Sequence, residues 1–114
     1  MIRRLTILLT FSALFPSSCA KPEPVANAGA ACAVATTRVT TQRGLPASHV
    51  AFCDGVSERD GPPGYYVMAL RAHCREELCG STLMGWFAVK KATGEVFEVD
   101  VNDWQVGRAV ADAP

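Results

Sequence analysis

The sequence has no excess of charge of either sign and no second long hydrophobic run. Eleven Lys and Arg residues balance eleven Asp and Glu residues over 114 positions, and no run of basic residues follows Arg4. Nucleic acid is therefore a poor candidate for a partner, because a surface that binds it carries clustered Lys and Arg. After the N-terminal apolar run, no stretch approaches the roughly 20 apolar residues of a membrane-spanning helix.

Residue combinations typical of catalysis are also lacking. The chain has only two histidines, and it contains no recognisable Ser, His and Asp set, phosphate-binding glycine loop or pair of catalytic carboxylates. We therefore expect a protein without enzymatic activity, and we expect neither a cofactor nor a metal.

The N-terminus has the pattern of an export signal. Arg3 and Arg4 precede an apolar run at residues 5–15, which is too short to span a bilayer and is typical of the core of a signal peptide. Removal of residues 1–18 leaves nine basic residues (eleven minus Arg3 and Arg4) against eleven acidic ones, a net charge of about −2.

Two processing sites fit the residues that follow. The small residues before Cys19 resemble a bacterial lipobox, in which the cysteine becomes the lipid-modified first residue, although Pro16 stands where that pattern prefers Leu. Alternatively, residues 18–20 form an A-x-A-like site for ordinary secretion. We favour lipidation at Cys19, and Ala20 next to it favours the periplasmic side of the outer membrane. Cleavage after Ala20 would instead give a soluble periplasmic or secreted protein.

Either cleavage removes Cys19 from the cysteines available for pairing. An even set of four in an exported chain predicts two disulfides, with three possible connectivities. We favour a bond between Cys74 and Cys79 that closes a loop between two strands, and a bond between Cys32 and Cys53 that holds the N-terminal segment. Exchanged pairings, such as Cys53 with Cys74, remain open.

Other uses of these cysteines are less favoured. A zinc site at His73, Cys74 and Cys79 lacks a usual ligand spacing, and adjacent residues of a strand point to opposite faces. A nucleophile pair of Cys53 with His49, one helical turn apart, has no group to orient the histidine. A thiol-redox enzyme that uses Cys74 and Cys79 is a third functional hypothesis, tested by thiol titration.

The mature chain divides into a tether and one small domain. Residues 19–30 are rich in Pro and Ala and aperiodic, which is typical of a flexible tether beyond the lipid anchor. In the domain, residues 31–114, the segment before Gly44 predicts a helix, and Pro46 begins a second short helix that ends at Gly55. The stretch 50–53 also fits a strand. Residues 57–64 form a loop.

The second half of the domain has the period-2 pattern of strands. Residues 65–72 predict a central strand with two apolar faces. Residues 85–91 and 95–101 predict a hairpin around a glycine-containing turn, with its inward side chains at Phe87, Val89, Phe97, Val99 and Val101. The sequence thus predicts an α+β fold, with one or two N-terminal helices packed on a three- to four-stranded antiparallel sheet stabilised by disulfides. The tail from Gln105 to Pro114 is expected to fray.

The strand GYYVMAL followed by WFAVKKATGEVFEVD resembles the strand-plus-hairpin element of PepSY-like and similar small periplasmic domains. The resemblance covers residues 64–101, and the Cys74–Cys79 insert departs from the pattern. It implies a helix packed on a small antiparallel sheet, in a protein that binds or restrains a partner in the cell envelope. Some relatives in that family are associated with inhibition of peptidases.

These features lead to a hypothesis of partner binding. We expect a non-enzymatic envelope lipoprotein that binds a protein, as an inhibitor of, or immunity protein toward, a periplasmic enzyme. The alternative is a structural accessory subunit of an envelope or secretion assembly. Candidate contact residues are the charged loop residues Arg75, Glu76 and Glu77 and the aromatic residues Trp86 and Trp104. For the two tryptophans and Tyr65, core or edge packing is the favoured interpretation over an exposed aromatic patch for a partner.

Overall fold

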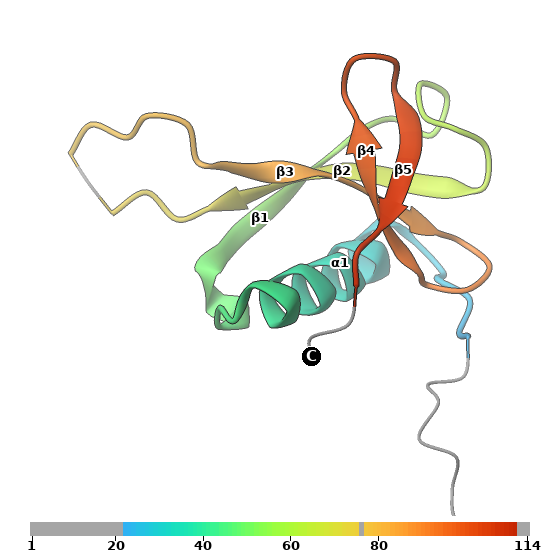
Figure 1. Ribbon diagram of the computed structural model, residues 1–114, viewed down its shortest axis with the longest axis horizontal. Helices are drawn as coiled ribbons and strands as arrows, with labels where there is room; N and C mark the ends of the chain where they lie inside the picture. Colours follow the sequence, from blue (N-terminus) through green and yellow to red (C-terminus); the bar gives the residue numbers. More distant parts are fainter. Residues whose placement is uncertain (1–21, 76, 112–114) are drawn as a thin grey trace, which may run out of the picture.

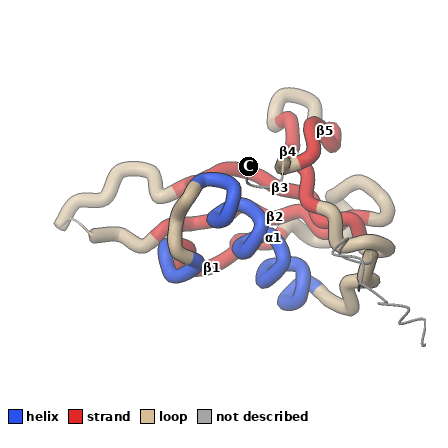
Figure 2. The backbone as a smooth tube through the Cα atoms, turned by 60° about the horizontal axis from the view of Figure 1, so that its bottom comes forward, coloured by secondary structure: helices blue, strands red, loops and turns tan. Residues whose placement is uncertain are grey.

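The computed structural model describes residues 22–75 and 77–111 and shows one α-helix lying across one face of an antiparallel sheet (Figures 1 and 2). The predicted signal peptide and the predicted lipidation site at Cys19 lie outside the described residues. Among those residues, no helix is long and apolar enough to cross a membrane. The elements in chain order are α1 Ala28–Arg43, the 3₁₀ helix η1 Ala47–His49, β1 Val50–Gly55, β2 Tyr65–Ala72, β3 Leu83–Lys90, β4 Val96–Asp100 and β5 Gln105–Ala109.

Helix α1 has a capping residue at each end. The Asn27 side chain accepts a hydrogen bond from the Ala30 backbone N–H at 2.8 Å, which satisfies one of the free donors of the first turn. At the other end Gly44 adopts a left-handed conformation with φ 67°, and the next N–H, of Leu45, bonds the Thr40 carbonyl at 2.8 Å. This is the glycine-terminated helix end that the sequence predicts.

The buried side of α1 consists of small residues. Ala31, Ala35 and Val39 recur every four residues and are fully buried, so they form one stripe along the helix. Thr40 is also buried, and its hydroxyl donates to the Thr36 carbonyl at 2.6 Å, which removes the cost of an unsatisfied polar group. The short side chains let the helix approach the sheet closely.

The five strands form a simple meander in the order β1-β2-β3-β4-β5, with every neighbouring pair antiparallel. This exceeds the predicted three to four strands because a strand forms at residues 50–55, where the favoured prediction was a helix and the alternative a strand, and another forms in the predicted frayed tail. The predicted second helix contains only η1, and β1 takes up the rest by pairing with β2. The predicted frayed tail contains β5, which is held by the N–H of Val110 donating to the Val96 carbonyl at 2.8 Å.

Both faces of the sheet bury apolar side chains. The larger cluster lies between the sheet and α1, and the smaller cluster on the opposite face joins Val67, Ala88 and Val99, with Val106 of β5 packed against it. Strand β2 therefore has two apolar faces, as predicted. The helix-side cluster consists of Ala31, Ala35, Val39, Met68, Leu70, Phe87, Val89, Val96 and Val110.

The predicted hairpin is present, but the two faces of β4 are exchanged relative to the prediction. Phe97 pairs with Ala88, and Val96 pairs with Val89, so Val96 is the residue of β4 that shares the helix-side face with Val89. The pairing of β4 with β5 is irregular between Phe97 and Val99, where the partner residues on β5 are Ala109 and Val106 and the extra residue lies on β5. The predicted inward residue Val101 is half exposed, because it lies in the turn after β4 has ended.

Ordered contacts begin before residue 31. The Val25 N–H donates to the Lys91 carbonyl at 2.8 Å, and the Tyr66 hydroxyl donates to the Ala26 carbonyl at 3.5 Å. The helix itself starts at Ala28. The second half of the predicted tether, residues 25–30, thus packs on the sheet.

An exposed ion pair between Lys91 and Glu58 joins the β3–β4 turn to the β1–β2 loop. The Lys91 ammonium lies 2.8 Å from Glu58 Oε1 and 4.7 Å from the centre of the Tyr66 ring. The hydrogen bond to Glu58 raises the pKa of Lys91, with a smaller opposing effect of desolvation. This pair connects the loop between β1 and β2 to the hairpin turn between β3 and β4.

Candidate functional site

The connection between β2 and β3 projects from the sheet as a narrow finger, which we define as residues 73–75 and 77–82 (Figure 1). At its root the Ala72 N–H donates to the Thr82 carbonyl at 2.8 Å. Further out, Cys74 and Cys79 are joined by a disulfide, with their Cα atoms 5.8 Å apart. Both arms are thus covalently held, and the predicted pairing of these cysteines is confirmed.

The tip of the finger carries an apolar side chain that the sequence analysis missed. Leu78 is 90% exposed, more than any other large hydrophobic residue among those described. A leucine inside a short cysteine-closed loop has no core to enter, and that signal was available in the sequence. Leu78 is therefore the strongest candidate for a contact residue.

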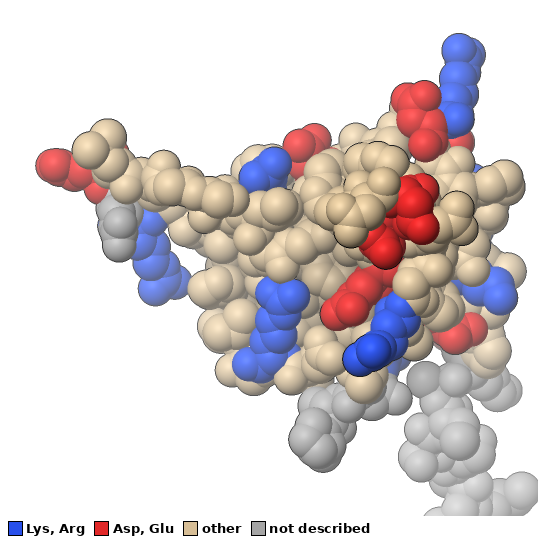
Figure 3. Space-filling view, turned by 45° about the horizontal axis from the view of Figure 1, so that its top comes forward, with Lys and Arg blue, Asp and Glu red and all other residues tan. Residues whose placement is uncertain are grey.

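Charged groups flank this leucine. Arg75 and Glu77 are exposed, whereas the third predicted residue, Glu76, lies outside the described residues. In Figure 3 red and blue atoms gather near the end of the finger, while its length toward the body is uncharged. The tip thus combines an exposed apolar side chain with charged groups of both signs.

The predicted aromatic residues Trp86 and Trp104 touch each other. Their rings meet edge to face, with centroids 5.2 Å apart and an interplanar angle of 78°. Trp86 comes from β3, and Trp104 comes from the turn that precedes β5. Tyr65 belongs to a separate contact, with Phe97 at 5.9 Å. The structure thus brings the two tryptophans together and leaves Tyr65 apart from them.

Two further exposed apolar residues share a face with this pair. Phe52 and Leu83 are 57% and 40% exposed, and both pair with Arg71 of the central strand β2. Their sequence neighbours Cys53 and Met84 pack on the helix side, so Phe52 and Leu83 point to the other side. We call Phe52, Leu83, Trp86 and Trp104 the aromatic face. It begins at the root of the finger, because Leu83 is the first residue of β3.

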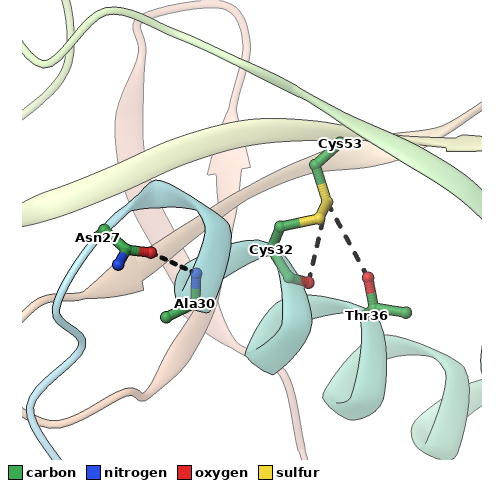
Figure 4. Close-up of a disulfide and its surroundings, with 5 residues drawn as sticks. All are labelled: Asn27, Ala30, Cys32, Thr36 and Cys53. Carbon is green, nitrogen blue, oxygen red and sulfur yellow. Dashed lines mark hydrogen bonds between the residues drawn. A yellow bond between two sulfur atoms is a disulfide. The ribbon is translucent and has the colours of Figure 1, made fainter.

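The second disulfide lies between α1 and β1 and joins the helix to the sheet (Figure 4). Cys32 of α1 bonds Cys53 of β1, with Cα atoms 5.9 Å apart, as predicted. The Thr36 hydroxyl lies 4.0 Å from the Cys53 sulfur. Because Cys53 is oxidised, it is not the free thiol that a nucleophile pair with His49 requires. Within the described part of the chain, no group of three or more His, Cys, Asp or Glu residues is arranged to hold a metal.

A pocket lies at the base of the finger. It has a volume of about 330 Å³ and is lined by His49 from η1 and by residues from both arms, including His73, Arg75, Ser81 and Thr82. The His73 N–H points to the His49 carbonyl at 3.4 Å, which connects the finger to the segment before β1. From the sequence, the two histidines are candidates only for a metal site or a nucleophile pair, whereas the structure places both in the lining of this pocket.

Comparison with protein-family models, with curated proteins and with solved structures found no match to this chain. The candidate site is therefore defined by its own geometry, and the resemblance to PepSY-like domains remains a prediction from the sequence.

Proposed function

We propose that this protein is a non-enzymatic envelope protein that binds a protein partner through the finger and the adjoining aromatic face. In the sharpest form of the proposal, it inhibits, or gives immunity toward, a periplasmic enzyme. Export and lipidation at Cys19 place it on the periplasmic side of the outer membrane. The two disulfides support export, because such bonds persist in oxidising compartments.

The observation that carries the proposal is the 90% exposure of Leu78 on a disulfide-closed loop. An apolar side chain held in water contributes binding energy as soon as a partner covers it. The closed loop loses little conformational freedom on binding, so less of that energy is spent on ordering. An inhibitor that inserts a loop into the cleft of an enzyme needs both properties.

The aromatic face supports the same role. Trp side chains are enriched among the residues that dominate binding energy at interfaces, and Trp104 is 45% exposed beside Trp86. Since Leu83 lies between this pair and the finger, a partner seated on the finger extends naturally along β3. The PepSY-like resemblance of residues 64–101 agrees with a helix-on-sheet protein that restrains an envelope enzyme.

The test is affinity capture from envelope extract with the oxidised mature protein, followed by identification of the bound proteins by mass spectrometry. A single stoichiometric hydrolase or toxin, whose activity falls on addition of the protein, would support the proposal. Capture of many secretion or outer-membrane components, with hydrolase activity unchanged, would instead make the protein an accessory subunit. Failure to capture any partner would contradict both roles.

A matched set of variants tests whether the captured partner contacts the finger. We expect L78D to lower the affinity for the partner at least tenfold. It should leave the unfolding midpoint unchanged, because the Leu78 side chain is exposed to solvent. V101D is the control, since Val101 is also exposed and apolar but lies in the turn after β4. Glu77→Lys tests the charged part of the tip. Equal effects of L78D and V101D would exclude the finger as the contact.

A further inference from the structure

The pocket at the base of the finger has a lining of unusual composition. Its ionisable side chains are His49, His73 and Arg75, and its hydroxyl groups come from Ser81 and Thr82. No Asp or Glu is among the residues described as lining it, and Glu77 of the same finger is not part of the wall. Each polar side chain of the lining is thus able to donate a hydrogen bond.

These donors are not used elsewhere in the described residues. The side chains of His49, His73 and Arg75 make no hydrogen bond or ion pair with any residue that the structure describes. Ser81 uses its oxygen to accept from the Leu83 N–H at 3.2 Å, which leaves its hydroxyl hydrogen to donate outward. The pocket therefore offers several donors and one fixed positive charge to an occupant that only accepts.

The walls are held in place before any ligand arrives. The Cys74–Cys79 disulfide forms part of the lining, and the hydrogen bonds from Ala72 to Thr82 and from His73 to His49 fix the floor. A backbone that is already held loses little conformational freedom when an anion binds, so the entropic cost falls on the exposed side chains of His73 and Arg75. Guanidinium and imidazole groups match the oxygens of carboxylates and phosphates.

From this lining we propose that the pocket is a binding site for a compact oxyanion, a carboxylate or phosphate group. Two sources supply such a group. One is a free small anion, and the other is an acidic side chain of the protein partner; the second rests on the proposed function. The volume of about 330 Å³ admits an anion of the size of citrate.

The test titrates the mature oxidised protein with citrate and, separately, with inorganic phosphate, at constant pH and ionic strength with chloride as the reference salt. Backbone amide and imidazole NMR signals report the site. We expect saturable shifts confined to His49, residues 72–75 and residues 79–82. Shifts that do not saturate, or that spread over Lys and Arg residues across the surface, would overturn the proposal.

Variants separate a built site from general charge attraction. Arg75→Gln and His73→Ala should each lower the affinity for citrate about tenfold, because the first removes the fixed positive charge of the lining and the second removes a hydrogen-bond donor. Arg59→Gln is the control, since it removes the same charge from the exposed loop between β1 and β2, and it should leave the affinity unchanged. An equal loss in all three variants would show unspecific attraction and contradict the site.

A competition arm distinguishes the two sources. If an acidic side chain of the partner occupies the pocket, citrate at saturating concentration will displace the captured partner. The Arg75→Gln variant will then also bind that partner with lower affinity. If citrate binds and the partner stays, the ligand is a free anion. The titration needs no partner, so its failure and a failure of the proposed function are separate results.

Discussion

Trp104 reaches back from the turn after β4 to place its ring against Trp86 of β3, 5.2 Å between centroids. Trp104 does so with a backbone φ of 57°, the one positive φ of a non-glycine residue among those described. A bulky residue in the left-handed region costs about 1–3 kcal/mol and persists only where its surroundings stabilise it. The contact with Trp86 is one such stabilising interaction, and it keeps an exposed aromatic side chain at a fixed position.

A double-mutant cycle measures this contact. We expect the effects of W86A and W104A on the free energy of unfolding to be non-additive by about 0.5–1.5 kcal/mol, the usual value of an edge-to-face pair. Urea denaturation of the four proteins gives the coupling. W104G is a useful control, because glycine removes the ring and also the backbone strain. Strictly additive effects of the two alanine variants would show that the pair contributes nothing.

The two disulfides should separate stability from binding. Loss of Cys32–Cys53 by paired Ser substitutions should cost about 3 kcal/mol, and loss of Cys74–Cys79 about 2 kcal/mol, because the closed loops differ in length. Only the variant without Cys74–Cys79 should lose much of its affinity for the partner. The variant without Cys32–Cys53 should lose stability but keep its affinity while it is folded. Thermal unfolding and the capture assay together check this. A finger variant with full partner affinity would contradict the role of the closed loop.

Gly85 tests the bend at the root of β3. Its φ is 146°, and a Cβ built on it would lie 3.1 Å from the Phe87 ring. We expect Gly85→Ala to lower the free energy of unfolding by about 1–3 kcal/mol, since backbone and ring must both shift. Gly55→Ala in β1 is the matched control, because no atom lies within 4 Å of its Cβ position. Urea unfolding that gives equal stabilities for both variants would contradict this.

The Lys91–Glu58 pair predicts an alkaline dependence of stability. Because folding raises the pKa of Lys91, the pair stabilises the protein fully below the pKa of the unfolded chain, about 10.4. That stabilisation is lost as the pH rises through the higher folded pKa. The difference in urea midpoint between the natural protein and Glu58→Gln should therefore be constant from pH 7 to about 9 and shrink above about 11. It should also fall with added salt, because both side chains are exposed. A difference that persists unchanged at high pH would exclude the pair as its cause.

The sequence by itself determined the parts of the fold whose signals are local. The runs of strand-forming residues in β2, β3 and β4, the glycine turn between β3 and β4, and the glycine after α1 each follow from short-range chemistry. The pairing of the four cysteines was also correctly favoured, because one pair closes a short loop and leaves the other two. The α+β class follows from these elements together.

Tertiary structure decided the rest. Residues 50–55 become a strand because β2 offers an edge with free hydrogen-bonding groups. Pairing with that edge outweighs the weak helical preference of so short a segment. Residues 105–109 become a strand because Val106 and Val110 find apolar partners that are distant in sequence. The face of Phe97 was also missed, because it depends on the pairing of β4 with β3, in which Phe97 lies opposite Ala88 and Val96 lies opposite Val89.

The candidate site divides in the same way. The finger and its disulfide could be predicted, since Cys74 and Cys79 are close in sequence, and Leu78 could have been found there as well. The contact between Trp86 and Trp104 and the pocket that joins His49 to His73 were decided only by folding. Each unites residues that are 18 or more positions apart, and no local periodicity encodes such a distance, because it results from the packing of the whole sheet.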